Sequence, residues 1–298
     1  EIGGAGLDVM NYVLLMEELS KVDASTSITV SVHTSLCASS IEEFATPEQK
    51  EKWLRPLVDG SKIGCFGLTE PDAGSDVAGA RTVAVKDGDE YVINGSKIFT
   101  TNSGFADTFL VFALTDKEAG PHKGMSAFLV DRNTPGISVQ PDIKRMGIRG
   151  ASNSEVVYTD VRVPAADLLG GEGKGFKIAM KALDGGRIGI AAQSVGLAQG
   201  ALDEAIAYCK ERKQFGKPIS AFQNTQFRFA ELQARIDAAR LLTWRAATAK
   251  DNGEAYNVYA AEAKLVASDV ANDVCRAAVQ FMGGYGYCRE YGVERKLR

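Results

Sequence analysis

The chain has 298 residues, of which 45% are hydrophobic, so it can bury a sizeable core in one large domain or two ordinary ones. Its 34 basic and 38 acidic side chains are interspersed and give a formal net charge of -4. This balance provides no basic surface for nucleic acid or anionic lipid, and the apolar runs are far too short to span a bilayer. We therefore expect neither a nucleic-acid nor a membrane partner.

The cysteines and histidines argue against a disulfide framework and against a metal centre. Five cysteines is an odd number, and no two of them form a CxxC pair. The two histidines, His33 and His122, are isolated, so we interpret them as packed or surface side chains and expect no metal. A reducing compartment is expected, namely the cytoplasm of a bacterium or the mitochondrial matrix of a eukaryote.

Residues 1–62 are interpreted as a partial N-terminal helical domain. The opening run from Glu1 to Gly6 lacks an initiator methionine and resembles a loop from a larger protein. From Leu7 to about Asp59, apolar residues at helical spacing predict two or three helices. Thr46, followed by a proline, provides the cap that begins one of them.

Residues 63–170 change to a β pattern and form the expected central domain. Strands are predicted at 82–85, 91–93, 109–114, 125–130 and 155–163. Asp87-Gly88 and Asn94-Gly95 are predicted as tight turns. Short strands joined by turns, without intervening helices, favour an antiparallel sheet or a small barrel.

Residues 171–298 are predicted to form an antiparallel helical bundle that is truncated. Its long helical segments are expected at about 176–212, 218–252 and 255–282. The glycine-rich loop 170–175 before them lacks the Lys-Ser/Thr ending of a P-loop and the GxGxxG spacing, so we interpret it as a linker. The fold class is therefore α+β with several domains.

Two turns carry the clearest functional signal. Thr69-Glu70-Pro71 and the following Ala73-Gly74-Ser75 expose amides and hydroxyls that can bind anionic oxygens or ring carbonyls. Phe99 and Thr101 are expected on the same side of an extended strand, where a ring and a hydroxyl can contact one flat ligand. These turns indicate a site for a flat ligand that bears phosphate.

Two further motifs leave alternatives open. Asp184-Gly185-Gly186-Arg187 places two glycines in a helical pattern, at a cost of about 1 kcal/mol each relative to alanine. Close approach of a ligand or another backbone explains them, and so does a simple helix kink. Arg212 lies in a run of charges that, taken alone, is typical of a solvated helix end.

Taken together, five motifs resemble the signatures of the acyl-CoA dehydrogenase family, and most of all its short-chain, butyryl-CoA type. They lie at 66–76, 94–102, 184–187, 212–216 and 280–287, and their order and spacing match across essentially the whole chain. The resemblance implies FAD as cofactor and α,β-dehydrogenation of a short-chain acyl-CoA, or the reverse enoyl-CoA reduction. It also implies an electron-transferring flavoprotein as electron acceptor and a homo-oligomer, either a tetramer or a dimer.

The resemblance also implies roles for individual residues. Thr101 would donate a hydrogen bond to flavin N5, and a neighbouring subunit would bind the adenosine half of FAD. The implied cofactor-binding residues are Phe66, Leu68, Thr69, Gly74, Ser75, Phe99, Thr100, Thr101, Arg212, Gln214, Gln223, Gln280, Gly283 and Gly284. The implied acyl-CoA-binding residues are Ser75, Asp184, Gly185, Gly186 and Arg187, with both glycines leaving room for the acyl chain.

No catalytic residue is assigned in this chain. The resemblance implies a glutamate base in a segment beyond Arg298, and in some relatives a base at the position of Gly186, which has no carboxylate. Asp184 is expected to point elsewhere because it lies at a different helical angle. We therefore expect little or no dehydrogenase activity from these 298 residues. The alternatives are a flavin-dependent oxidase or monooxygenase on the same scaffold and a non-catalytic CoA-binding or assembly protein.

Overall fold

The computed structural model describes residues 2–298, which divide into two compact units. The sheet unit contains residues 2–6, Thr29–Lys144 and Ala151–Gly186. The helical unit contains Leu7–Ile28, Arg145–Gly150 and Arg187–Arg298. The domain boundaries predicted at residues 62 and 170 stay a prediction.

The N-terminal region is helical, as predicted, but it contains more elements than the two or three expected. They are α1 (Val9–Val22), α2 (Ala24–Ser31), the π-helix η1 (Val32–Ala38), α3 (Ser39–Phe44), α4 (Pro47–Gln49), the π-helix η2 (Lys50–Leu54) and α5 (Arg55–Val58). The cap predicted at Thr46 is confirmed. Thr46 Oγ1 accepts from the Gln49 N–H at 3.2 Å, and the Gln49 side chain accepts from the Thr46 N–H at 3.1 Å.

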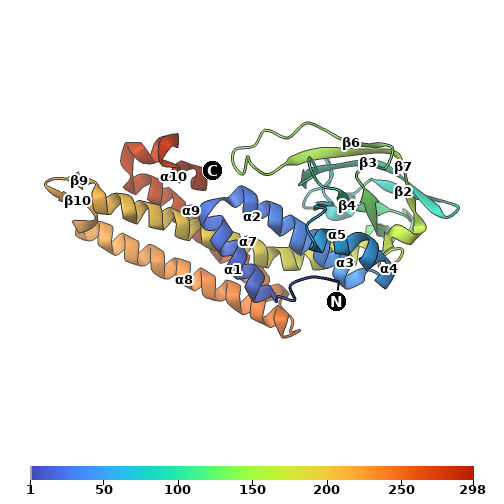
Figure 1. The fold of residues 1–298 in the computed structure, drawn as a ribbon, viewed down its shortest axis with the longest axis horizontal. Coiled ribbons are helices and arrows are strands. Elements are labelled where there is room, and N and C mark those ends of the chain that lie inside the picture. The colour runs from blue at the N-terminus through green and yellow to red at the C-terminus, as the bar shows by residue number, and fades with distance from the viewer. Residues whose placement is uncertain (1) are drawn as a thin grey trace. The chain divides into compact units, whose positions relative to one another are not determined.

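An eight-stranded sheet forms the framework of the sheet unit (Figure 1). Its strands are β1 (Gly64–Gly67), β2 (Val83–Asp87), β3 (Glu90–Thr101), β4 (Thr108–Leu114), β5 (Met125–Asp131), β6 (Ile137–Val139), β7 (Asn153–Pro164) and β8 (Leu168–Leu169). The short helices η3 (Val77–Gly79), α6 (Pro121–Gly124) and η4 (Ala165–Asp167) lie in its connections. The strand predictions at β2, β3, β4, β5 and β7 are confirmed, whereas β1, β6 and β8 were not predicted.

The sheet is mixed and open, which corrects the prediction of an antiparallel sheet or small barrel. Its order is β6-β7-β3-β2-β4-β5-β8, with β1 added on β4. Both β1 and β2 pair with β4 in parallel, and the other neighbours are antiparallel. A parallel pair needs a long connection, and residues 68–107 supply it between β1 and β4. Within residues 2–298 the end strands β6 and β8 do not pair, so the sheet does not close.

The tight turn predicted at Asn94-Gly95 is wrong, because β3 continues through both residues. The register between β3 and β7 shifts between Ile93 and Gly95, which marks a β-bulge. Gly95 has φ 147°, and a Cβ there would lie 2.8 Å from the Thr82 Cα. The glycine therefore serves a close approach between strands rather than a reversal of the chain.

The glycine-rich loop 170–175 is fixed on the sheet. The Gly173 N–H donates to Ser126 Oγ at 2.9 Å, and the Tyr91 hydroxyl lies 3.1 Å from a carboxylate oxygen of Glu172. We interpreted this loop as a linker from its composition. Its hydrogen bonds show that the connection from β8 to the next helix is held in place.

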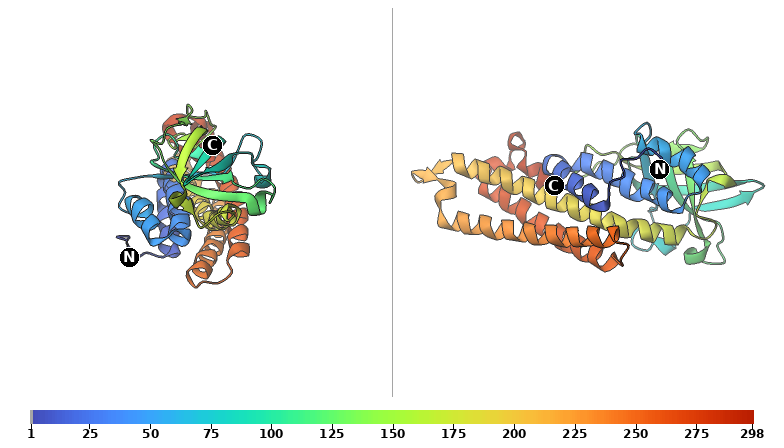
Figure 2. Two further views of the ribbon diagram at one scale, coloured as in Figure 1. Left: turned by 90° about the vertical axis from the view of Figure 1, so that its right-hand side faces the viewer. Right: turned by 60° about the horizontal axis from the view of Figure 1, so that its bottom comes forward.

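Long helices dominate the helical unit, as predicted (Figure 2). They are α7 (Gly175–Glu211), whose residues from Arg187 onward belong to this unit, α8 (Gln223–Asp251) and α9 (Asn257–Phe281), and α8 packs on α9. The hairpin of β9 (Lys213–Gln214) and β10 (Lys217–Pro218) delays the start of α8 beyond the predicted residue 218. Four short helices complete the unit: η5 (Ile219–Ala221), η6 (Gly283–Tyr287), η7 (Arg289–Tyr291) and α10 (Val293–Leu297).

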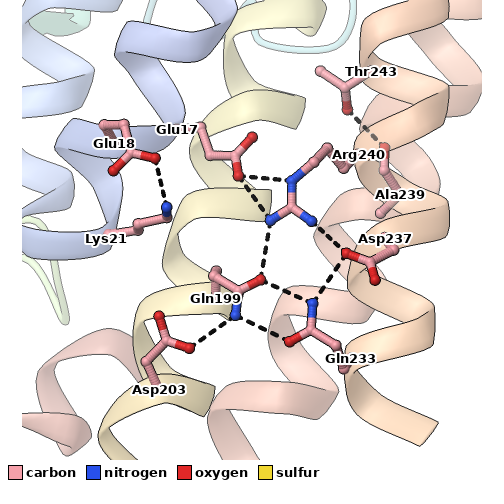
Figure 3. A network of polar contacts seen from close by, with 10 residues as sticks. All are labelled: Glu17, Glu18, Lys21, Gln199, Asp203, Gln233, Asp237, Ala239, Arg240 and Thr243. Carbon is pink, nitrogen blue, oxygen red and sulfur yellow. Dashed lines mark hydrogen bonds and ion pairs between the residues drawn. The ribbon is translucent and has the colours of Figure 1, made fainter. Parts of the chain in front are cut away.

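A buried polar network connects α1, α7 and α8 inside the helical unit (Figure 3). The Arg240 guanidinium donates to Glu17 Oε1 at 2.8 Å and to Gln199 Oε1 at 3.0 Å. Gln199 and Gln233 exchange two hydrogen bonds of 3.1 Å. Because both charges of the Glu17–Arg240 pair are largely buried, this network fixes the register of the three helices.

Among residues 2–298, no helix combines the length and the apolar composition that crossing a bilayer requires.

Candidate functional site

A closed turn follows β1 at the first predicted motif. Phe66 and Leu68 are buried, while Thr69 is half-buried. The backbones of Glu70 and Ala73 exchange hydrogen bonds of 3.0 and 3.1 Å and close the turn. Directly after the turn, Gly74 and Ser75 are exposed to solvent. The segment therefore offers backbone and hydroxyl groups to a ligand on a rigid base.

A bulge at the end of β3 presents Phe99. The β3–β7 register shifts between Lys97 and Thr100, and Phe99 adopts φ 55° with 59% of its surface exposed. Left-handed backbone is unfavourable for an aromatic residue and marks functional sites when the surrounding structure maintains it. The expectation of an extended strand is wrong at Phe99 itself, which leaves the extended conformation, whereas the expectation that Phe99 and Thr101 face the same side stays a prediction.

Thr101 is oriented by a residue that the sequence did not reveal. Asn153 Nδ2 donates to Thr101 Oγ1 at 3.1 Å and to the Phe99 carbonyl at 3.3 Å. With its oxygen already accepting, the Thr101 hydroxyl can direct its proton toward a ligand. Asn153 lies on β7 directly opposite Thr101 in the sheet register, so only strand pairing identifies it.

Buried polar atoms without a partner gather at this strand end. Within residues 2–298, side-chain atoms of this kind include Thr100 Oγ1, Asn102 Oδ1, Ser103 Oγ and Asn153 Oδ1. Native proteins leave few buried polar atoms unsatisfied, so a cluster of four within one strand end is consistent with partners supplied by a ligand or by water. The amide nitrogen of the same Asn102 side chain does have partners, because Nδ2 donates to the carbonyls of Thr29 and Gly64 at 3.0 and 3.2 Å.

A buried ion pair connects β3 to the turn that follows β1. Lys97 on β3 is fully buried, and its Nζ lies 2.6 Å from Glu70 Oε1. Burial lowers the pKa of Lys97, although the carboxylate opposes this effect. Burial alone would raise the pKa of Glu70, but the Lys97 charge and several hydrogen bonds outweigh it, so this pKa lies below its ordinary value. Neither residue was assigned a role from the sequence.

The predicted substrate motif lies in the interior of α7. Asp184 is half-buried, Gly185 and Gly186 are buried, and Arg187 is half-buried. A Cβ at Gly186 would lie 3.0 Å from Leu36 Cδ2 of η1. Close packing of two helices is therefore one reason for this glycine, although the Leu36 methyl is the end of a flexible side chain, and the role of Gly186 toward an acyl chain stays a prediction. α7 continues without interruption through both glycines.

The remaining predicted residues belong to the helical unit. Arg212 follows α7, and its guanidinium lies 5.5 Å from the Tyr285 ring centre in η6. Its carbonyl accepts from the Ile219 N–H at 2.9 Å, which closes the hairpin before α8. The structure thus brings the arginine together with the glycine-rich η6 turn, and it leaves these predicted positions exposed: Arg212, Gln214, Gln223, Gln280, Gly283 and Gly284.

Models of the acyl-CoA dehydrogenase N-terminal, middle and C-terminal domains match residues 1–61, 65–161 and 173–298. The chain is 54% identical over 298 residues to the short-chain specific acyl-CoA dehydrogenase of Clostridium acetobutylicum. That alignment covers 100% of this chain and 78% of the relative.

Three solved structures show the same fold. One is butyryl-CoA dehydrogenase from Megasphaera elsdenii, with TM-score 0.97 and 51% identity, covering 99% of this chain and 78% of that chain. A chain in a structure of the electron transferring flavoprotein of Acidaminococcus fermentans gives TM-score 0.98 and 51% identity over 99% of this chain and 78% of that one. A glutaryl-CoA dehydrogenase from Mycobacterium smegmatis in complex with FADH2 gives TM-score 0.93 and 34% identity. This match covers 100% of this chain and 75% of that chain.

Proposed function

This chain belongs to the acyl-CoA dehydrogenase family, and on that premise we propose that it acts in the FAD-dependent α,β-dehydrogenation of short-chain acyl-CoA thioesters, or in the reverse enoyl-CoA reduction. The observation that carries the proposal is the exposed Phe99 ring, held at φ 55° beside a Thr101 hydroxyl that Asn153 orients. A flat ring with a polar edge fits this surface.

FAD is the cofactor that the residues of the sheet unit fit. An aromatic ring with 59% exposure on a buried strand offers a surface for the isoalloxazine ring. The exposed Gly74 and Ser75 would meet the pyrophosphate side. Bound FAD supplies an acceptor for the β-hydrogen of the acyl-CoA as hydride.

The chain's own residues bind and orient in this scheme. The ring would be lined by Phe66, Leu68, Thr69, Phe99 and Thr100. The Thr101 hydroxyl would donate a hydrogen bond to the ring nitrogen N5. A donor preorganised toward developing negative charge lowers the barrier of hydride arrival. Ser75 and the α7 motif, with Arg187, bind the acyl-CoA.

The exposed positions of the helical unit have a second role in the proposal. In the proposal, the adenosine half of FAD on a neighbouring copy of the chain is bound by Arg212, Gln214, Gln223, Gln280, Gly283 and Gly284. A guanidinium can pair with pyrophosphate oxygens, and glycines allow a close approach of the backbone. The protein would therefore be a homo-oligomer, a tetramer or a dimer. The electron acceptor would be an electron-transferring flavoprotein, which the likeness to the Acidaminococcus fermentans structure supports.

We propose that no carboxylate within residues 1–298 serves as the α-proton acceptor. Gly186 has no side chain to supply one, and it packs against Leu36. We propose a glutamate for this role and assign it to no position among these residues. A general base must reach the proton that it removes, so residues 1–298 alone should turn over acyl-CoA slowly or not at all.

The test is reconstitution of the purified chain with FAD, followed by visible spectroscopy and anaerobic addition of butyryl-CoA. We expect FAD binding, a shifted flavin spectrum in Thr101→Val, and no shift in Thr159→Val, which removes an exposed hydroxyl from β7 of the same sheet. Absence of FAD binding would contradict the proposal. Turnover of butyryl-CoA at an ordinary enzymatic rate would contradict the assignment of the base, and fast reoxidation in air would favour an oxidase.

A further inference from the structure

We propose that the buried Lys97–Glu70 ion pair is a positioning pair for the flavin site: it holds the loop of residues 69–82 in register with the end of β3. The inference rests on the proposed function for its flavin readout. Its structural part concerns only contacts within the sheet unit.

The Glu70 carboxylate, at the beginning of the loop, binds two other segments at once. Lys97 Nζ on β3 lies 2.6 Å from Oε1. At the far end of the loop, the Thr82 N–H donates to Oε1 at 3.0 Å and the Arg81 N–H donates to Oε2 at 2.6 Å. One side chain thus joins the beginning of the loop, its end and the neighbouring strand.

Lys97 completes the connection from the strand side. Its Nζ also donates to the Leu68 carbonyl at 3.1 Å, directly after β1. Next to it along the strand, the Ile98 N–H donates to the Thr69 carbonyl at 2.8 Å. The next residue is the strained, exposed Phe99. Bonds from Lys97 and Ile98 to Leu68, Thr69 and Glu70 therefore join the loop to the two strand residues that precede Phe99.

The pair is more than a stabilising contact, because its burial is costly and its partners are specific. Two buried charges are rarely more stable than apolar residues of similar size, so a gain in stability alone does not explain them. Side chains that bind a ligand need a supporting shell that fixes their positions to a fraction of an ångström. The Lys97–Glu70 pair supplies that support where the loop and the strand meet.

The experiment compares Lys97→Met, the double variant Lys97→Met/Glu70→Leu, and the control Arg162→Met. The control also converts a cation to methionine and breaks an ion pair with a β3 residue, Glu90, but that pair is exposed. Hydrogen exchange of the Arg81 and Thr82 amides is measured without FAD. FAD affinity is measured by fluorescence, and thermal stability is followed in parallel.

We expect Lys97→Met to weaken FAD binding about tenfold or more, a typical effect of removing a supporting residue. The Arg81 and Thr82 amides should exchange faster in this variant, whereas those of β4 should stay protected. The double variant leaves no buried carboxylate unpaired, but it removes the acceptor of the Arg81 and Thr82 N–H groups, so it should recover neither FAD affinity nor the protection of these two amides. Arg162→Met should match the original chain in all three measurements.

Two results would overturn the inference. One is unchanged amide exchange at Arg81 and Thr82 in Lys97→Met, together with unchanged FAD affinity. The other is FAD affinity that follows thermal stability across all the variants, because this would reduce the pair to a structural role. If the original chain itself fails to bind FAD, the proposed function fails, while the amide exchange still tests the positioning of the loop.

Discussion

The end of β3 and the polar network of the helical unit both contain polar side chains, but these side chains differ in whether they have hydrogen-bond partners. In the network, Glu17, Arg240, Gln199 and Gln233 bind one another. At the β3 end, by contrast, four buried polar atoms have no partner within residues 2–298, and a large ring is exposed.

In the proposed function, this difference separates residues that hold the fold from residues at a ligand site. A polar group bound by other residues of the chain contributes to a unique packing arrangement. A buried polar group left without a partner costs stability, and a fold retains it where a ligand provides the partner. Changes in the network should therefore affect stability, whereas changes at the β3 end should affect binding.

The largest expected effect is on stability in the network. Arg240→Met leaves the Glu17 carboxylate buried without its cation, and we expect a loss of about 3–5 kcal/mol in the free energy of unfolding. Urea denaturation measures this loss. The matched control Arg245→Met on the same helix breaks an exposed pair with Glu262 and should cost at most about 1 kcal/mol. An equal loss of unfolding free energy in Arg240→Met and Arg245→Met would contradict the stabilising role of the network.

The second effect should appear in binding alone. Phe99→Ala removes the exposed ring, and we expect FAD binding to weaken by about 1–3 kcal/mol, the range measured for aromatic stacking on flat ligands. The free energy of unfolding without FAD should change by less than about 0.5 kcal/mol, as for other exposed positions. Phe227→Ala, also at an exposed ring, should change neither quantity. A stability loss without a binding loss would assign Phe99 to the core.

A smaller, pH-dependent effect is expected at His33, whose Nδ1 accepts from the Gly64 N–H at 3.1 Å. Burial lowers the pKa of His33 below its ordinary value of 6.5, so folding favours the neutral ring. The resulting stability is present above pH 6.5 and is lost as the pH falls through the lower folded pKa. Urea denaturation at several pH values should show a shallower decline in His33→Gln. The same dependence of stability on pH in the original chain and in His33→Gln would contradict this expectation.

The smallest effect is expected at Tyr158, a fully buried residue whose hydroxyl is without a partner among residues 2–298. Tyr158→Phe removes this hydroxyl and should leave stability unchanged or raise it by up to about 1 kcal/mol. Tyr91→Phe is the control, because the Tyr91 hydroxyl has Glu172 as partner and its loss should lower stability by about 1 kcal/mol. A marked loss in Tyr158→Phe would indicate a bound water as the missing partner.

The sequence predicted the regular elements well where the signal is local. Helical spacing identified the three long helices, and the Thr46 cap follows from neighbouring residues. Five strands were identified by β-branched and aromatic runs. The turn signal at Asn94-Gly95 was misleading, because a glycine at a bulge and a glycine in a turn have the same local signature.

For the site, the sequence alone determined the family and the candidate residues, because both depend on motifs that are contiguous in the chain. The tertiary structure alone decided which polar groups have partners. Asn153 reaches Thr101 only through pairing of β3 with β7, and Lys97 meets Glu70 only when the loop returns to the strand. Such contacts join residues distant in sequence, so no local pattern records them, and their cost in chain entropy is met only by the complete fold.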